Sequence, residues 1–362
     1  MKLTIKTIKL QEMLSKSVKC AGNNKLVPIS SLLGIKQKDN QLELTTTNVK
    51  DYLYVREENE CDGEFSVTVY VDTFSKLISK LTCEYVSLEL KDSCLEVTGN
   101  GTYKINLPLD ENGDVIKYPN PVKTYTENAE FSETGEIELF NIKTISNSIK
   151  PALAVTPEVP CYMAYYMGDK VIATDTYKIA GLMEKVFDKP KLLSANTIEL
   201  LTLIEEPKVK FTAFANGTLL FETPKITVFS SVVEGLEDYA VDAITNLLNL
   251  TTDSYCEIVK DSLLQLLDRL ALFVSPYDKN AVNLTFTNDG IVVTSKSSSG
   301  EELIPYATIH DFKEFTCAAD IQMLQTQIKA IPTNLVTLYF GSQQALKLKT
   351  NNLIQIIGLL SD

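Results

Sequence analysis

The chain has 362 residues, of which 44% are hydrophobic, enough to bury a sizeable core and to build two or three domains. Its net charge of -13 argues against a protein that binds nucleic acid by overall charge attraction. Seven cysteines without a C-x-x-C spacing favour neither a disulfide framework nor a zinc site, so we expect no metal and a reducing compartment. No apolar stretch approaches the roughly 18 residues that span a bilayer, and we expect a soluble, cytoplasmic protein.

One order of predicted elements, namely helix, strands, helix and strands, occurs three times at intervals of about 120 residues. Hydrophobic periodicity predicts these elements, in chain order, at 8–21, 32–55, 71–81 and 85–107, then at 140–153, 164–182, 194–205 and 209–232, and finally at 260–274, 283–294, 320–331 and 336–360. Each copy also passes from its second helix through a short break into an alternating strand, in the sequences ISKLTCEYVSLEL, LTLIEEPKVKFTA and IKAIPTNLVTLYF. We therefore predict an α+β protein of three similar domains.

Two interruptions separate the copies. Between the first and second copies, Pro119 and Pro121 flank Asn120, and the two prolines exclude regular structure. Between the second and third copies, the sequence GLEDYAVD at 235–242 is polar and lacks strand alternation. The predicted domains are therefore 1–122, 123–237 and 238–362.

Basic residues lie on the predicted outer faces of five of the six helices. Lys16 and Lys19 lie opposite the apolar stripe of the first helix, and Lys76 and Lys80, at i and i+4, lie off the stripe of the second. The exception is the helix at 194–205, which carries acidic residues and no lysine. Charges more than about 10 Å apart are largely screened near 0.1 M salt, so a basic inner surface can attract phosphates weakly within an acidic protein. The alternative is that these lysines only solvate helix exteriors.

The segment 173–180, with sequence A-T-D-T-Y-K-I-A, resembles A-T-D-G-H-R-L-A of the bacterial sliding clamp, the beta subunit of DNA polymerase III. The opening MKLTI and the later LVPI are similar to M-K-F-T-I and T-L-P-I of that family, and segment order and lengths agree over the whole chain. The resemblance implies the DNA clamp fold, in which three similar domains each place two helices along a hole and antiparallel sheets outside. Two subunits would close head to tail into a homodimeric ring.

The function implied by the resemblance is that of a DNA polymerase processivity factor without enzymatic activity or cofactor. Its expected partners are double-stranded DNA, encircled without sequence specificity, the replicative DNA polymerase and the clamp loader. The basic residues expected to face DNA are Lys16, Lys19, Lys25, Lys76, Lys80, Lys143, Lys150, Arg269 and Lys329. At the dimer interface, Tyr103 and Ile105 would meet the partner subunit's Phe273 and the partner subunit's Val274. The alternative for these four is that they are ordinary core residues.

The resemblance also implies a pocket for a short peptide of polymerase, loader and repair partners. Its matching positions are Tyr162, Thr174, Thr176, Tyr177, Lys178, Ile179, Tyr239, Val241, Met323, Ala345, Ile357, Gly358, Leu359 and Leu360. Where the family has glycine and histidine, this chain has Thr176 and Tyr177, and its tail replaces the proline and arginine of M-P-M-R with Gly358 and Leu360. We therefore expect a narrower and less polar pocket, whereas the alternative for the tail is simple packing as a terminal strand. The divergence is compatible with a phage or mobile-element copy.

Catalytic interpretations find little support. His310 is the only histidine, lies beside Asp311 in a predicted loop, and has no nucleophile elbow or Cys-His arrangement around it. No phosphate-binding loop or G-x-G-x-x-G element occurs, and the acidic turn at 110–114 lacks the ligand spacing of an EF-hand. The alternative function is a non-enzymatic protein-interaction scaffold with the clamp fold that does not encircle DNA, which the acidic charge would favour.

Overall fold

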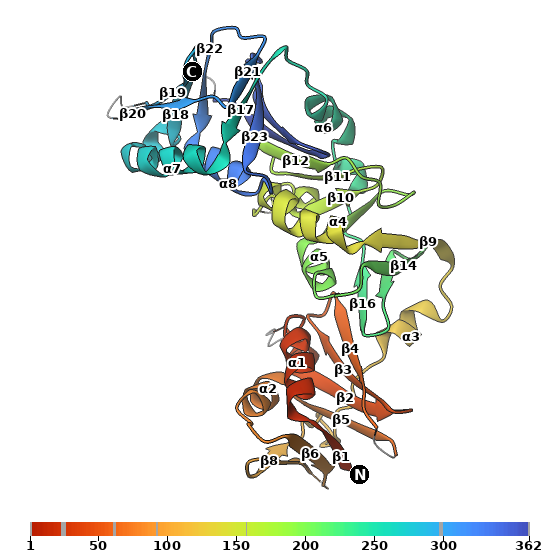
Figure 1. Ribbon diagram of the computed structural model, residues 1–362. Coiled ribbons are helices and arrows are strands. Elements are labelled where there is room, and N and C mark those ends of the chain that lie inside the picture. Colours follow the sequence, from red (N-terminus) through yellow and green to blue (C-terminus); the bar gives the residue numbers. More distant parts are fainter. Residues whose placement is uncertain are drawn as a thin grey trace. The chain divides into compact units, whose positions relative to one another are not determined.

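The computed structural model describes residues 2–22, 27–60, 63–91, 93–156, 158–296 and 300–360 (Figure 1). All six predicted helices are confirmed. They are α1 (Thr7–Ser17), α2 (Val71–Ser79), α4 (Leu139–Thr144) with a π-helical turn at Ile145–Ile149 and a 3-10 turn at Lys150–Ala152, α5 (Ala195–Leu201), α7 (Lys260–Leu270) and α8 (Ile321–Lys329).

The three copies share one element order, which confirms the predicted repeat. Each has a strand, a helix, further strands, a second helix and three closing strands. The first copy contains β1 (Lys2–Lys6), β2 (Leu32–Lys38), β3 (Gln41–Thr47), β4 (Tyr52–Glu58), β5 (Phe65–Tyr70), β6 (Tyr85–Leu90), β7 (Cys94–Thr98) and β8 (Thr102–Asn106). The second contains β9 (Phe131–Glu138), β10 (Ala164–Met167), β11 (Val171–Thr174), β12 (Lys178–Leu182), β13 (Lys191–Ser194), β14 (Lys208–Phe214), β15 (Thr218–Glu222) and β16 (Ile226–Ser231). The third contains β17 (Ser254–Val259), β18 (Ala281–Phe286), β19 (Gly290–Ser295), β20 (Glu301–Pro305), β22 (Phe315–Asp320), β23 (Leu335–Phe340), β24 (Ala345–Thr350) and β25 (Leu353–Gly358), with β21 (Thr308–His310) in addition.

Strand pairing within the copies repeats as well. The strand before the first helix pairs antiparallel with the strand after the second helix, as β1–β6, β9–β14 and β17–β23. The strand after the first helix pairs with the strand before the second, as β2–β5, β10–β13 and β18–β22. One backbone hydrogen bond recurs at the start of each first helix, from Thr7 to Glu84 at 2.9 Å, from Leu139 to Pro207 at 2.8 Å and from Lys260 to Asn334 at 2.8 Å. The recurring helix-to-strand sequences therefore occupy equivalent positions in the fold.

The larger sheets continue from one copy into the next. An eight-stranded sheet has the order β5-β2-β3-β4-β16-β15-β14-β9, and a nine-stranded sheet has the order β13-β10-β11-β12-β25-β24-β23-β17-β21. Two four-stranded sheets, β1-β6-β7-β8 and β20-β19-β18-β22, complete the first and third copies. The chain accordingly forms two compact units, 1–140 with 196–232 and 141–195 with 233–362. The predicted boundaries at 122 and 237 follow the repeat, whereas the compact units follow the shared sheets.

The exclusion of regular structure at 119–121 was wrong at its last residue, where α3 begins, and the segment 235–242, which contains no strand as expected, ends in the first turn of α6. In the first linker, α3 (Pro121–Thr126) begins with Pro121 at its first position, where the missing N–H is no loss, and the Asn120 side chain accepts the Lys123 N–H at 3.2 Å. In the second, α6 (Val241–Leu248) buries Ile244 and Leu248, which lie four residues apart on one face.

A buried carboxylate joins the first copy to elements of the second within the first compact unit. Asp51, only 2% exposed, accepts hydrogen bonds at one oxygen from the Ser230 hydroxyl at 2.6 Å and the Thr197 hydroxyl at 3.1 Å. Its other oxygen accepts from the amides of Asn196 at 2.7 Å and Asn48 at 3.0 Å. These partners come from α5, β16 and the turn before β4, so the carboxylate holds three elements in register.

Replacing Asp51 with alanine should destabilise this unit, because two buried hydroxyls and two half-buried amides lose an acceptor at once. We expect Asp51→Ala to lower the free energy of unfolding by about 3 kcal/mol, measured as a lower urea midpoint. Asp72→Ala, which removes an exposed carboxylate from α2, serves as the matched control and should change it by less than about 0.5 kcal/mol. An equal response of the two variants would show that the buried network is energetically unimportant.

Candidate nucleic-acid and partner-protein interfaces

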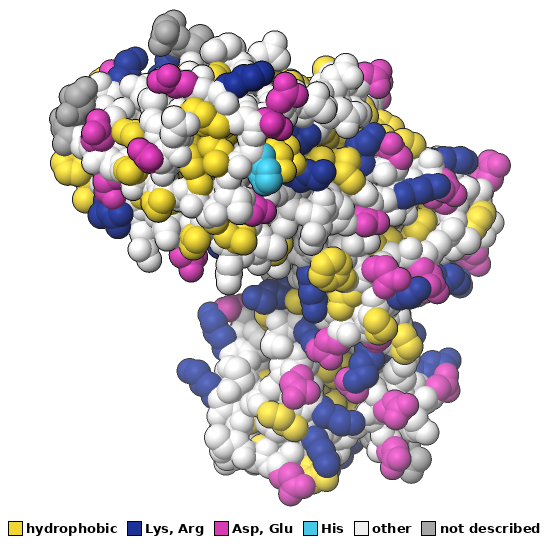
Figure 2. Space-filling view, turned by 45° about the horizontal axis from the view of Figure 1, so that its top comes forward, with side chains coloured by type: hydrophobic (Ala, Val, Ile, Leu, Met, Phe, Trp, Pro, Cys, Tyr) yellow, Lys and Arg dark blue, Asp and Glu magenta, His cyan; other side chains and the backbone are white. Residues whose placement is uncertain are grey.

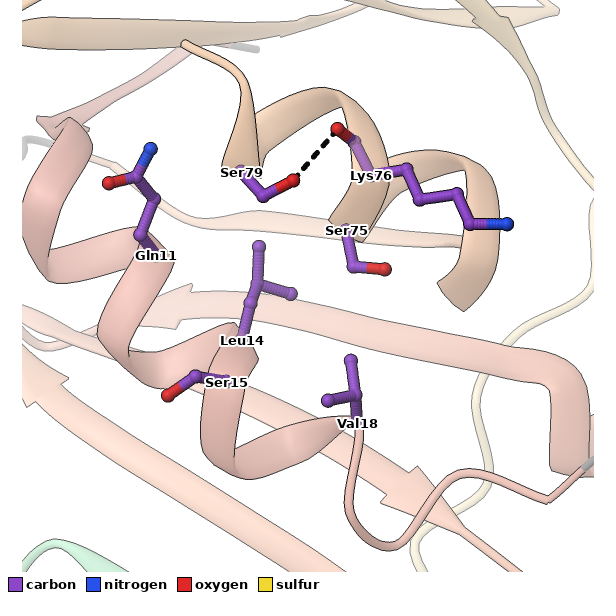
Figure 3. A pocket seen from close by; sticks show the side chains of 7 residues that line it. All are labelled: Gln11, Leu14, Ser15, Val18, Ser75, Lys76 and Ser79. Atoms are coloured by element: carbon purple, nitrogen blue, oxygen red, sulfur yellow. Dashed lines mark hydrogen bonds between the residues drawn. The ribbon is translucent and has the colours of Figure 1, made fainter. Parts of the chain in front are cut away.

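The first two helices lie side by side on the first compact unit and expose a mixed face. Figure 3 shows the shallow hollow between them, into which Leu14 of α1 and Val18, directly after α1, point opposite Ser75 and Ser79 of α2. The hollow has a volume of about 220 Å³. Lys76 lies at its edge, while Lys19 and Lys80 are exposed just beyond the ends of α1 and α2. The predicted outward orientation of these lysines is therefore confirmed within this unit.

Several of the predicted DNA-facing cations are paired with acidic side chains. Lys16 contacts Glu205 at 2.6 Å and Lys76 contacts Asp72 at 2.7 Å. Arg269 binds Glu302 through two nitrogens, and its shortest contact is 2.6 Å. This hydrogen-bonded pair lowers the pKa of Glu302 and raises that of Arg269. Exposed pairs of this kind bind weakly, yet they remove part of the charge that phosphates would meet.

The other predicted cations are exposed on both units. Lys19, Lys80, Lys143 and Lys329 are exposed and form no ion pair with any residue in the described ranges, and Lys150 is exposed too. Lys25 lies outside the described residues. On the face drawn in Figure 2, basic and acidic side chains are intermixed instead of gathered into one basic patch. A shared DNA-facing surface across the two units stays a prediction.

The segment that resembles the family motif forms a tight turn between β11 and β12. Asp175 organises it, because one carboxylate oxygen accepts the N–H groups of Tyr177 at 3.0 Å and Lys178 at 2.9 Å, and the other contacts the Lys178 amine. Thr176 has φ of 79°, in the left-handed region where the family's glycine fits without strain. The turn presents the ring of Tyr177, which is 66% exposed, to solvent.

The predicted pocket residues divide between the two faces of the nine-stranded sheet. On the face covered by α6, Tyr162, Ile179, Tyr239 and Ala345 are buried in one apolar cluster, with Val241 packed against it. On the opposite face, Ile357 is fully buried in the core beneath α7 and α8, against which Met323 and Leu359 pack. Thr174, at 2% exposure, is also buried. Six of the predicted pocket residues are therefore buried in this structure, Thr174, Ala345 and Ile357 among them, and the peptide pocket stays a prediction.

The tail is tied into the sheet instead of lying along its surface. The Gly358 N–H donates to the Tyr177 carbonyl at 2.9 Å, a bond that the family's proline could not make. A side chain at Gly358 would approach the Tyr177 carbonyl oxygen to 2.9 Å, so glycine suits this contact. The Leu359 and Leu360 N–H groups donate to the carbonyls of Gln344 at 3.0 Å and Ala318 at 2.8 Å. Strand packing of the tail, the alternative considered from the sequence, is therefore what the structure contains.

The residues that the sequence did not single out lie on and beneath α6. Ile244 and Leu248 contribute to the cluster around Tyr239, whose ring packs edge-on against Tyr162 at 5.0 Å and whose hydroxyl donates to the Ile172 carbonyl. The Lys347 amine, buried under the end of α6, donates to the carbonyls of Leu248 at 2.8 Å and Leu250 at 2.9 Å. The spacing of apolar residues in 241–248 was the available signal for this helix.

Two of the predicted dimer residues lie on the edge strand β8 of the first copy, and the other two follow α7 in the third copy. Tyr103 is 38% exposed on β8, and Phe273, after α7, is 46% exposed. Ile105 is buried and Val274 packs against the third-copy core, so these two act first as core residues, as the alternative held. His310, exposed on β21, stacks on Tyr255 with ring centroids 4.5 Å apart. Among the described residues, no group of three or more His, Cys, Asp or Glu could hold a metal ion, and no helix is long and apolar enough to cross a membrane.

The fold defined by these sheets and helix pairs is the DNA clamp fold. The sliding clamp of Bacillus subtilis has a TM-score of 0.84 at 17% identity, covering 100% of this chain and 99% of that chain, and the Streptococcus pyogenes beta subunit has 0.84 at 16% with full coverage of both. In sequence, the beta sliding clamp of Rickettsia bellii is 22% identical over 342 residues, 88% of this chain and 87% of that protein. Residues 1–119 match the family model described as DNA polymerase III beta subunit, N-terminal domain. The chain thus has the fold of these sliding clamps, and its first 119 residues match the family model, so the resemblance inferred from its sequence is confirmed.

Thr176→Gly should stabilise the second compact unit, because glycine adopts a positive φ without the strain of a β-branched side chain. A gain of about 1 kcal/mol in the free energy of unfolding is expected, measured by urea denaturation. Asn280→Gly, at a φ of 50°, is the control and should gain less, since asparagine tolerates this region. Unchanged stability of Thr176→Gly would mean that the turn is not strained.

The buried amine of Lys347 should make the free energy of unfolding vary with pH in the alkaline range. Burial, and secondarily Lys349, lower the pKa of its amine from 10.5. Between that lowered pKa and the unfolded value the unfolded chain binds more protons, so stability rises with pH. The unfolding free energy of the native chain, relative to Lys347→Met, should therefore increase as pH rises from about 8 towards about 10. Lys349→Met should weaken this rise without removing it, and a constant difference between native chain and Lys347→Met would contradict the assignment.

Proposed function

We propose that this chain is the subunit of a DNA polymerase processivity factor that encircles duplex DNA as a head-to-tail homodimer and has no enzymatic activity. The observation that carries the proposal is a rule of strand pairing between copies. The third strand after the first helix of one copy pairs with the final strand of the next copy, as in β4–β16 and β12–β25. In the third copy, the strand equivalent to β4 and β12 is β20. By the same rule, β20 should pair with the final strand of a first copy, which is β8.

The strands β8 and β20 each have one edge that pairs with no other described strand of the same chain. Within the described residues, β8 pairs only with β7, and β20 pairs only with β19. Open strand edges are templates for pairing with another chain. In a dimer, β8 of each subunit would pair with β20 of the other subunit. Two such contacts would close a ring of six domains.

The side chains at the two edges support this pairing. Leu303 on β20 is 53% exposed, and it shares its face of the strand with Glu301, whereas Lys104 projects from the exposed face of β8. An acidic and a basic strand edge meet favourably in a head-to-tail contact and disfavour β8–β8 or β20–β20 pairing. Tyr103 and Phe273, both partly exposed, supply apolar area beside the strands.

Encircling DNA would explain how a protein with a negative net charge can stay on DNA. A ring retained by topology needs little adhesion, so a net charge of -13 and paired cations on the helices are compatible with sliding on DNA. The replicative polymerase and the clamp loader are the proposed protein partners. They would bind at the surface around Tyr177, Val241 and the exposed parts of the tail, above the aromatic cluster beneath α6.

The test of this function is retention after loading on closed DNA. Protein loaded on nicked circular DNA should stay bound when salt is raised, and linearising the DNA should release it. The charge-reversed variant Lys19→Glu with Lys80→Glu should load less well, while Lys296→Glu, away from these helices, is the control. Equal loss from circular and linear DNA would favour the alternative, a protein-interaction scaffold that does not encircle DNA.

Leu303→Asp should separate the dimer without unfolding the subunit, because the side chain is exposed in the single chain. Introducing a carboxylate beside Glu301 into a paired strand edge opposes association by like-charge repulsion and desolvation. Sedimentation should show the mass of one subunit, about 40.3 kDa, in place of two. Val155→Asp, at a side chain that is 89% exposed elsewhere, should stay dimeric. A dimeric Leu303→Asp would place the interface at another surface.

A further inference from the structure

The first linker covers a polar cavity on the outer face of the eight-stranded sheet. The cavity, of about 260 Å³, is formed by strands β2 to β5 of the first copy and by the linker residues Lys117, Tyr118 and Asn120. The Tyr118 ring lies directly on Gly34, where a side-chain carbon would approach the ring to 2.7 Å. Glycine at this strand position therefore makes room for the linker to pass over the sheet.

Two tyrosine hydroxyls in this cavity are buried without a partner. The Tyr54 side chain is only 5% exposed, and neither its hydroxyl nor that of Tyr118 forms a hydrogen bond of normal geometry with a described residue. The Val122 backbone lies near the Tyr54 hydroxyl and opposes the effect of burial on its pKa. Burial raises the pKa of both phenols, so each stays a neutral hydrogen-bond donor. A buried unsatisfied polar group costs about 1–3 kcal/mol, and a bound acceptor would recover much of that cost.

The charges around the cavity favour an anionic acceptor. Lys36 and Lys117 line it, are exposed, and form no ion pair with a described residue. Glu43, the carboxylate in the lining, is held by Arg56 at 2.7 Å, and Arg56 also donates to the Thr227 hydroxyl at 2.7 Å. Two lysines thus remain to attract a negative group, while the one acidic side chain is already neutralised.

The position of the cavity in the repeat identifies the source of that group. The first linker follows β8 and leads into α3, which lies against β15 and packs Val122 on Tyr54 of β4 and Phe229 of β16. The second linker likewise follows β16 and leads into α6, which contacts both β12 and β25. We propose that the cavity under the first linker is a second partner site, which takes a carboxylate of a peptide segment between the hydroxyls of Tyr54 and Tyr118 and beside Lys36 and Lys117. That the ligand is a peptide rests on the proposed function, because the second linker borders the proposed partner surface.

The test uses the full-length protein and an N-acetylated, C-amidated tetrapeptide with a single glutamate. Carbon-13 labelling of the tyrosine rings lets NMR follow both phenols, whose signals are assigned by their loss in Tyr54→Phe and Tyr118→Phe. Titration should shift these two signals, and each phenylalanine variant should bind about tenfold more weakly, since it removes one hydrogen bond to a charged acceptor. Tyr70→Phe, at an exposed ring outside the cavity, is the matched control and should bind normally.

Three results would overturn the site as described. Equal binding of the same peptide with glutamine would exclude the carboxylate. Equal binding of free N-acetylglutamate would make the ligand a small anion and not a peptide. Unmoved Tyr54 and Tyr118 signals at millimolar peptide would mean that water alone satisfies the two hydroxyls.

The same variants separate this inference from the proposed function. The variants Tyr54→Phe and Tyr118→Phe should be retained on nicked circular DNA to the same extent as the native chain, because neither residue lies on the helices proposed to face DNA. If the native chain binds the peptide but is not retained on circular DNA, the proposed clamp function alone is contradicted. If it is retained on circular DNA but does not bind the peptide, only the second site is contradicted.

Discussion

Backbone pairing between strands of successive copies is the constraint on which the rest of this structure depends. By the pairing rule, each copy has one strand edge for the copy after it and one for the copy before it, and the pairs β4–β16 and β12–β25 use four of these six edges. The remaining two, on β8 and β20, follow from the same rule. Because each junction is a continuous sheet, the unit that resists unfolding is the sheet and not the sequence repeat. This explains why the compact units divide the middle copy.

Two kinds of polar group stabilise the shared sheets at their junctions. In the first unit, the Asp51 carboxylate collects four donors from elements of two copies. In the second, the Lys347 amine collects two carbonyls at the end of α6. Both are buried and both are directional, so each fixes an angle that apolar contacts alone would leave free. In the proposed ring the angles between copies must add up to a full turn, and directional bonds of this kind help to set those angles.

The sequence was sufficient for what depends on local periodicity. Six helices and the strands between them follow from the spacing of residues such as Leu10 and Leu14 in α1 or Leu263 and Leu267 in α7, all of which are buried. It failed where one local signal outweighed another. Pro121 was taken as a breaker although it starts α3, and the acidic residues before Val241 hid the short apolar face of α6. Pairing between distant strands leaves no local signal, so the burial of Ile357 and the splitting of the predicted pocket over two sheet faces could not be predicted.

The backbone around Thr176 and Gly358 shows what two departures from the family motif do. Where the family has glycine, Thr176 keeps the left-handed turn and accepts its strain, while Asp175 holds the turn through two N–H groups. Where the family has proline, Gly358 adds one more hydrogen bond to the strand ladder beside that turn. The two changes are neighbours across the β12–β25 pair, and the second offsets part of the cost of the first. Because Asp175 holds the backbone of the turn, the exposed ring of Tyr177, which stands where the family has histidine, changes the chemistry of the turn's surface without taking part in the bonds that shape it.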